Sequence, residues 1–260
     1  MNSTLLGASL SLYFLASVLY LANLHIKSPR MAIYGTVAAS IGFALQSSRL
    51  VYQTFTLGSP FATPPEAMFF LSWAIIATYL VTLIWFKLPA VGALAMPLSV
   101  IALALAYRFR GNDGETFIQS GWISLHVYAI IISLALFAIA FCCAIFFLVQ
   151  NWLLKNKRLT VMFRKLPPLQ TIDNLAYHLA AIGFPMLTLG IITGVVGVKQ
   201  NIVHLGNLKI RLIVAGLTWA IYALYLLSRR TAHWRGKKSN GILIFGTVAI
   251  ALTVGLHHFV

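Results

Sequence analysis

The sequence contains very few charged residues and almost no acids. Charged residues make up 9% of the 260 positions, whereas an ordinary soluble domain carries about 25%. The acids are Glu66, Asp113, Glu115 and Asp173. So few carboxylates exclude a multi-carboxylate metal site and leave little for general acid–base catalysis. Because GxSxG, P-loop and HExxH motifs are also missing, we expect a protein that is not an enzyme.

Cysteine is scarce as well. The two cysteines, Cys142 and Cys143, are adjacent within an apolar run, and the sequence has no CxxC or CxxCH motif. This arrangement excludes a disulfide framework and a thiol redox motif, so we interpret both thiols as packing residues. The first apolar run has no basic segment before it and no small-residue cleavage site, which favours a retained helix over a signal peptide.

Long apolar runs dominate what is present. Hydrophobic residues make up 60% of the chain, too much for a soluble fold of this length to bury. A bilayer-spanning helix needs about 20 mostly apolar residues. The sequence therefore predicts an all-α integral membrane protein, a single transmembrane domain over 1–260 built as a bundle of about eight helices. We expect these helices at 4–26, 31–53, 65–86, 88–107, 122–153, 174–198, 207–228 and 240–259.

The fifth run is too long for a simple span. We expect its end, from Gln150 to Lys157, to project into the aqueous phase. Pro167 and Pro168 should then break the chain before a new helix starts at Asp173.

The basic residues sit in short loops between the apolar runs. The net charge of +15 could suggest nucleic acid binding, but this placement favours a role in topology and in contacts with anionic lipid headgroups. Thirteen of the lysines and arginines fall in odd-numbered connections and six in even-numbered ones. The positive-inside rule makes the thirteen cytoplasmic. Both termini are then on the outer side of a bacterial plasma membrane.

This topology assigns four histidines to the outer face: His126, His204, His257 and His258. Imidazole binds haem iron, and two histidines can hold it from opposite faces. His126 and the His257–His258 pair would lie at the same depth. Phe117, Trp122 and Phe259 could supply aromatic surface, and Arg108 and Arg110 could pair with propionates. Each histidine could instead be an ordinary interfacial or capping residue.

Two further features have two interpretations each. Glu66 begins the third predicted helix after Pro64 and Pro65, where a carboxylate favours the helix dipole. It could also be a functional acid near the outer site. Gly190 and Gly194 form a GxxxG pair, which indicates close helix packing or, alternatively, the close approach of a flat ligand.

Several segments resemble the cytochrome c assembly family of polytopic haem-handling proteins, which includes system II cytochrome c biogenesis proteins and HemX-like proteins. Residues 58–73 resemble the outer loop and third core helix of the family, and 122–127 resemble the start of a helix that carries an outer haem-ligand histidine. The match is strongest at 173–194. Residues 234–237 and 255–259 resemble the final basic turn and the terminal segment with the second outer histidine.

The resemblance implies that His126 and His257, or the adjacent His258, are axial ligands of a b-type haem held without a covalent bond. It also implies other cytochrome c biogenesis membrane proteins as partners. The chain departs from haem-delivering members because residues 198–212 lack the tryptophan-rich WWD motif. Gln46 and Leu227 stand where such members can carry inner histidines.

Three functions therefore remain open. The first is a haem-handling membrane protein that coordinates haem at the outer face. The second is a HemX-like regulatory or structural subunit that has lost haem. The third, a small-solute permease, is disfavoured because few ionisable residues lie within the spans.

Overall fold

The computed structural model describes residues 3–26, 28–57, 63–109, 121–157, 168–199, 208–232 and 234–257. Within these ranges the regular structure is helical, without strands, which agrees with the predicted all-α class. The helices are α1 (Ser3–His25), α2 (Pro29–Leu57), α3 (Pro64–Phe86), the short 3₁₀ helix η1 (Pro89–Val91), α4 (Gly92–Arg108), α5 (Gly121–Lys155), α7 (Leu169–Lys199), α8 (Leu208–Arg230) and α9 (Lys237–His257).

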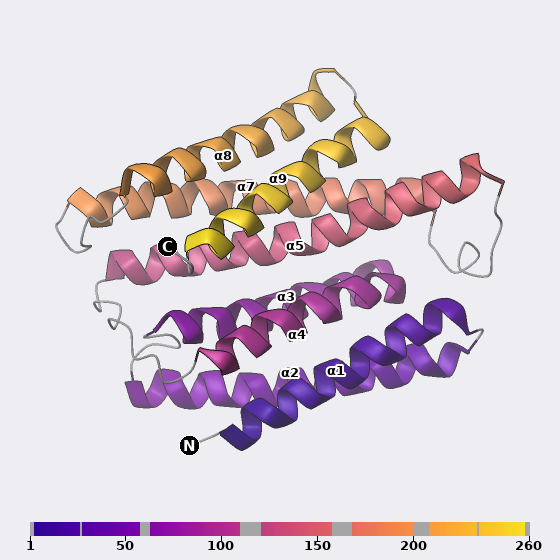
Figure 1. Ribbon diagram of the computed structural model, residues 1–260, viewed down its shortest axis with the longest axis horizontal. Helices are drawn as coiled ribbons and strands as arrows, with labels where there is room; N and C mark the ends of the chain where they lie inside the picture. Colours follow the sequence, from indigo (N-terminus) through magenta and orange to yellow (C-terminus); the bar gives the residue numbers. More distant parts are fainter. Residues whose placement is uncertain are drawn as a thin grey trace. The chain divides into compact units, whose positions relative to one another are not determined.

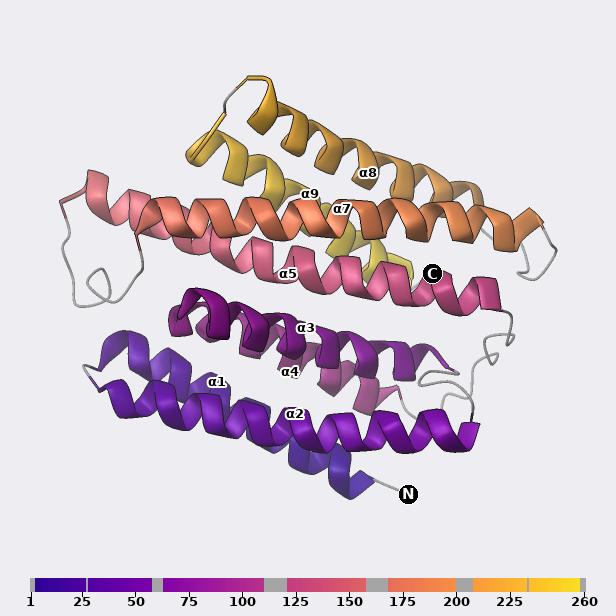
Figure 2. The same ribbon diagram turned by 180° about the vertical axis from the view of Figure 1, so that it is seen from behind.

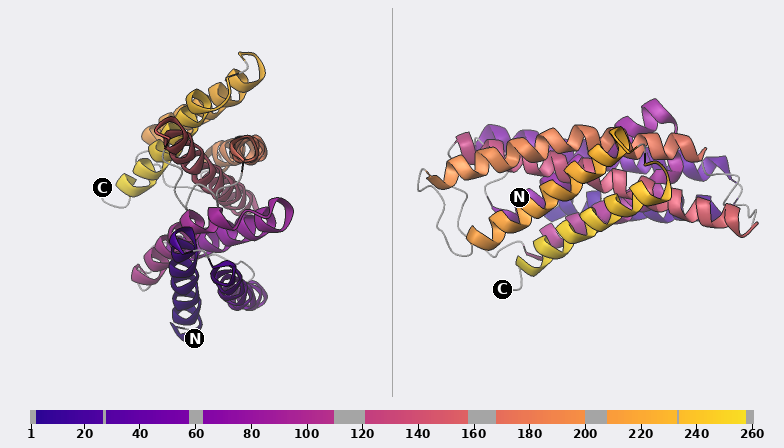
Figure 3. Two further views of the ribbon diagram at one scale, coloured as in Figure 1. Left: turned by 90° about the vertical axis from the view of Figure 1, so that its right-hand side faces the viewer. Right: turned by 90° about the horizontal axis from the view of Figure 1, so that it is seen from above.

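The chain forms two compact units. The first contains α1 to α4, and the second contains α5, α7, α8 and α9. In the first unit α1 packs against α2 and α4, and α3 packs against α4 (Figure 1). In the second unit α7 lies along α5 over much of its length (Figure 2), while α8 and α9 are inclined to that pair (Figure 3).

Buried polar side chains connect the helices of the first unit. The Tyr13 hydroxyl donates to Gln46 Oε1 over 2.6 Å, and Gln46 Nε2 donates to the Phe69 carbonyl over 2.9 Å. Gln46 therefore joins α1, α2 and α3. Between α3 and α4, each of Ser72 and Ser99 donates its hydroxyl to the backbone carbonyl of the other. Such bonds suit an apolar surrounding, where an unpaired polar group is costly.

Glycines let α5 and α7 approach closely in the second unit. A Cβ on Gly183 would lie 2.7 Å from the Phe137 ring, and one on Gly190 would lie 2.5 Å from Ile130. Spacings of seven and four residues place Gly183, Gly190 and Gly194 on one face of α7. The structure thus supports the packing interpretation of the GxxxG pair.

Six of the described helices are long and apolar enough to cross a membrane: α1, α3, α5, α7, α8 and η1 with α4. The chain is therefore a multi-pass membrane protein. Helices α2 and α9 have comparable lengths, 29 and 21 residues, but α2 carries polar side chains such as Gln46 and Gln53 within its length.

One detail of the predicted helix ends is wrong. Helix α7 begins at Leu169, directly after Pro168, so Asp173 does not start the helix but lies buried in its second turn. Proline suits the chain just before a helix, because no intrahelical donor is lost there. At the end of α5, Gln150 and Leu153 are buried, whereas residues 154–157 are exposed.

Candidate functional site

His126 lies in the second turn of α5 and is held against α7. Its Nδ1 is 2.6 Å from the Gly190 carbonyl oxygen, and the ring is half-buried. A carbonyl oxygen can only accept, so Nδ1 carries the proton and donates it. In a neutral imidazole the lone pair is then on Nε2.

Gly194 makes room for this ring. A Cβ at position 194 would lie 2.8 Å from both Cε1 and Nδ1 of His126. The Gly190 carbonyl also accepts a hydrogen bond from the Thr193 hydroxyl at 3.0 Å. The local sequence of α7 therefore fixes both the position and the tautomer of the histidine.

This geometry is one that metal-ligating histidines use. Such histidines usually donate the second ring N–H to a carbonyl or carboxylate, which orients the ring and raises the basicity of the ligating nitrogen. His126 therefore fits an axial-ligand role, with Nε2 as the nitrogen that would bind haem iron.

His257 is the last residue of α9, at the same end of the second unit as His126. Helix α9 packs against α5, and Gly236 near its start meets Phe147 in the C-terminal half of α5, so the two helices run antiparallel. Helix α9 is close to α5 near its start and diverges from it toward its C-terminal end, so His257 shares an end of the unit with His126 without lying beside the start of α5 (Figure 3). Trp122, one turn before His126, is 46% exposed at this end.

Glu66 and Arg108 belong to the first unit. Glu66 is in the first turn of α3, which starts with Pro64 and Pro65, and Arg108 is the exposed last residue of α4. Because α3 and α4 are antiparallel neighbours joined through η1, both residues lie at one end of that unit.

The structure describes only some of the other histidines and basic candidates. His258, Arg110 and His204 lie outside the described residues, as do His233 and the candidates Phe117 and Phe259. His178 is exposed in the N-terminal half of α7, and its Nδ1 is 2.7 Å from the Asn174 carbonyl one turn earlier. It is thus about three turns of α7 from the His126 contact.

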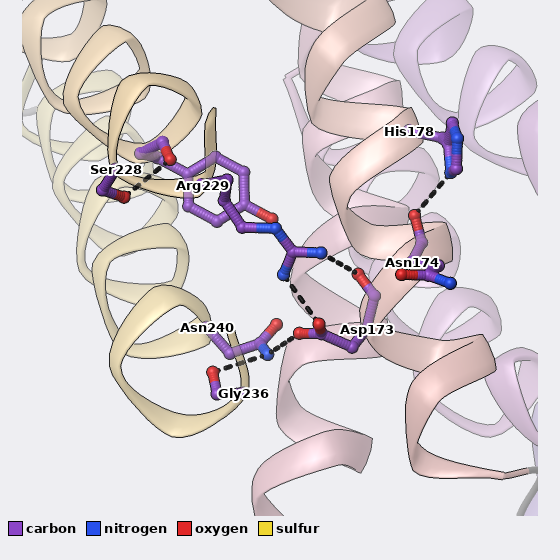
Figure 4. A network of polar contacts seen from close by, with 8 residues as sticks. Asp173, Asn174, His178, Ser228, Arg229, Gly236 and Asn240 are labelled. Atoms are coloured by element: carbon purple, nitrogen blue, oxygen red, sulfur yellow. Dashed lines mark hydrogen bonds and ion pairs between the residues drawn. The ribbon is translucent and has the colours of Figure 1, made fainter. Parts of the chain in front are cut away.

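A buried polar cluster at the opposite end of the second unit was not foreseen (Figure 4). Arg229 Nη1 pairs with Asp173 Oδ2 at 2.8 Å, and Asn240 Nδ2 donates to Asp173 Oδ1 at 2.6 Å. The Arg229 guanidinium also lies over the Tyr177 ring, 4.9 Å from its centroid. These contacts join α7, α8 and α9. An acid directly before the predicted span at 174–198 was the signal available in the sequence.

The structure also gives Gln46 a packing role. This residue is buried, and both ends of its amide are hydrogen-bonded to neighbouring helices. Leu227, the other position where relatives can carry a histidine, is exposed on α8.

Comparison with known proteins gives a consistent family. Residues 61–256 match the family model described as cytochrome C assembly protein. The chain is 26% identical to protein HemX of Brevibacillus brevis over 234 residues, covering 87% of this chain and 85% of that protein. It is 25% identical to the cytochrome c biogenesis protein CcsA of Mesostigma viride, with 95% and 90% covered.

A third relative, the cytochrome c biogenesis protein CcsA of Chlamydomonas reinhardtii, is 29% identical over 201 residues. That alignment spans 74% of this chain and 56% of the algal protein. No solved structure matches the chain significantly.

Proposed function

The chain belongs to the cytochrome c assembly protein family, and from this membership we propose that it is a haem-handling protein that coordinates haem at the outer membrane face. It acts through coordination and positioning, not through bond-making. Its partners are other membrane proteins of cytochrome c biogenesis.

The environment of His126 is the observation that carries this proposal. The hydrogen bond from Nδ1 to the Gly190 carbonyl and the space left by Gly194 hold the ring with Nε2 as its lone-pair nitrogen. Bound haem would supply an iron that imidazole nitrogens can ligate. His126 would hold that iron together with His257 or the adjacent His258.

The remaining candidates keep, in this proposal, the roles that the sequence suggests for them. Trp122 offers an aromatic face one turn from His126, and Arg108 and Arg110 pair with the propionates. Glu66 acts as an acid near the same outer site. The whole of 1–260 then works as one transmembrane domain of the family type, in a bacterial plasma membrane.

The proposed orientation needs eight crossings with both termini outside. The charge asymmetry of thirteen against six basic residues supports it. Helices α2 and α9 are included as spans because their 29 and 21 residues would reach across about 30 Å of hydrocarbon.

A second function is a HemX-like regulatory or structural subunit without haem. The missing tryptophan-rich loop and the packing role of Gln46 favour it, because both remove features that haem-delivering members carry. The similarity to protein HemX is compatible with it.

The absorption spectrum of the purified protein separates the two functions. We expect protein made with ample haem to show a bis-histidine Soret band, which His126→Gly abolishes and added imidazole restores. His178→Gly is the matched control, because its Nδ1 also contacts a backbone carbonyl. A colourless wild-type protein that takes up no added haem would establish the haem-free function instead.

A further inference from the structure

We propose that the polar cluster at the Asp173 end of the second unit is a hydrated site that holds ordered water among Tyr225, Ser239 and Asn240. The proposal does not depend on haem binding. It rests on buried oxygen atoms that the described protein groups do not satisfy.

Three buried oxygens gather here on two helices. Within the described chain, Tyr225 Oη on α8 and Ser239 Oγ and Asn240 Oδ1 on α9 have no protein hydrogen-bond partner. All three side chains are fully buried, at 0% exposure. The hydroxyls of Tyr225 and Ser239 lie close enough to interact with each other. A buried oxygen atom without a hydrogen-bond donor is unfavourable, because it has lost its contact with water.

The amide of Asn240 shows which way the unsatisfied group points. Its nitrogen donates to both Asp173 Oδ1 and the Gly236 carbonyl, so the assignment of nitrogen and oxygen is fixed by two acceptors. Oδ1 is consequently directed away from both and needs a donor.

The charges in the cluster limit the kind of ligand that it can bind. Asp173 and Arg229 neutralise each other in a 2.8 Å ion pair, so the cluster offers no net charge to a metal cation or an anion. The described residues also contain no group of three or more His, Cys, Asp or Glu side chains able to hold a metal ion. A small neutral molecule that both donates and accepts is needed, and water meets this requirement.

The cluster lies where α8 ends and α9 begins. Arg229 is in the last turn of α8, and Asn240 is in the first turn of α9. Gln150, whose buried Oε1 also lacks a partner among the described groups, lies three residues beyond Phe147, the α5 residue that meets Gly236. It therefore adds a polar atom about one turn nearer the end of α5.

Hydroxyl-radical footprinting by X-ray radiolysis tests the proposal on the intact protein in nanodiscs. Radicals form from bound water, so we expect Tyr225 to be oxidised faster than Tyr222 if water lies beside it. Tyr222 is the matched control, since it is on the same helix, equally buried, and bonded to Thr247. Equal protection of the two tyrosines would overturn the proposal.

A pair of serine substitutions gives an independent readout. Ser239→Ala should lower the Tm, because the water loses a partner. Ser133→Ala should leave the Tm unchanged or raise it. Ser133 is also buried and unpaired within the described chain, but it lies between Ile130 and Phe137, which pack tightly on glycines of α7. A rise in Tm for Ser239→Ala would mean that the cluster is dry.

Discussion

At the scale of single residues, the orientation of the His126 ring depends on a glycine of the adjacent helix α7. The ring contacts α7 where Gly194 leaves no side chain and where the Gly190 carbonyl accepts its proton. The Gly190 carbonyl oxygen and the missing side chain at Gly194 therefore decide which imidazole nitrogen can act as a ligand. A substitution at Gly194 on α7 should therefore displace the His126 ring, although the histidine itself is not mutated.

Gly194→Ala tests this dependence. The added Cβ would lie 2.8 Å from two ring atoms, so the ring must move and the bond to Gly190 must lengthen. We expect a loss of stability of about 1–3 kcal/mol, as for other overpacked sites, measured by thermal unfolding in detergent. Gly216→Ala is the control, because nothing lies within 4 Å of its Cβ position. That change should be neutral or stabilising.

A second residue-scale prediction concerns the bond between Tyr13 and Gln46. Tyr13→Phe and Gln46→Leu each break it, so in a double-mutant cycle they should be coupled by about 1 kcal/mol. Tyr222→Phe removes a hydroxyl in the second unit. Its effect on stability should simply add to that of Gln46→Leu, without coupling. Additive effects of Tyr13→Phe and Gln46→Leu would show that the 2.6 Å bond contributes no stability.

At the scale of helices, the apolar runs predicted most elements but not the contacts that hold them together. Hydropathy located the helices because a spanning segment needs length and apolar composition. It misplaced the start of α7, since Asp173 resembles a helix start when its partner is unknown. Arg229 is 56 positions away, and neither residue alone indicates a buried pair. The contact of His126 with the Gly190 carbonyl could not be predicted either, because its acceptor is a backbone atom that every residue carries.

The three-helix contact around Asp173 leads to a prediction at this scale. Asp173→Asn leaves the Arg229 guanidinium buried without its counter-ion, and breaking a buried pair costs about 3–5 kcal/mol. We expect α8 and α9 to separate from α7 early in unfolding, and tryptophan fluorescence can monitor this separation. Arg230→Gln removes only a long, exposed hydrogen bond to Tyr177, so it should change the unfolding curve much less. Equal curves for Asp173→Asn and wild type would contradict a stabilising role for the pair.

At the scale of the whole molecule, the open point in the topology is whether α2 and α9 cross the membrane. Helix α2 is long enough, and its polar Gln46 is satisfied inside the first unit, so its lower hydropathy does not prevent insertion. The charge asymmetry then predicts Ser28 on the cytoplasmic side and Thr56 on the outer side.

Thiol labelling of whole cells with a membrane-impermeant maleimide measures this directly. Cys142 and Cys143 are fully buried, so they should not react and need not be replaced. We expect Thr56→Cys and Arg108→Cys to be labelled in intact cells, and Ser28→Cys and Lys157→Cys only after permeabilisation. Labelling of Ser28→Cys and Thr56→Cys from the same side would mean that α2 does not span. The crossings before α3 would then drop by one, and the N-terminus would move to the cytoplasmic side.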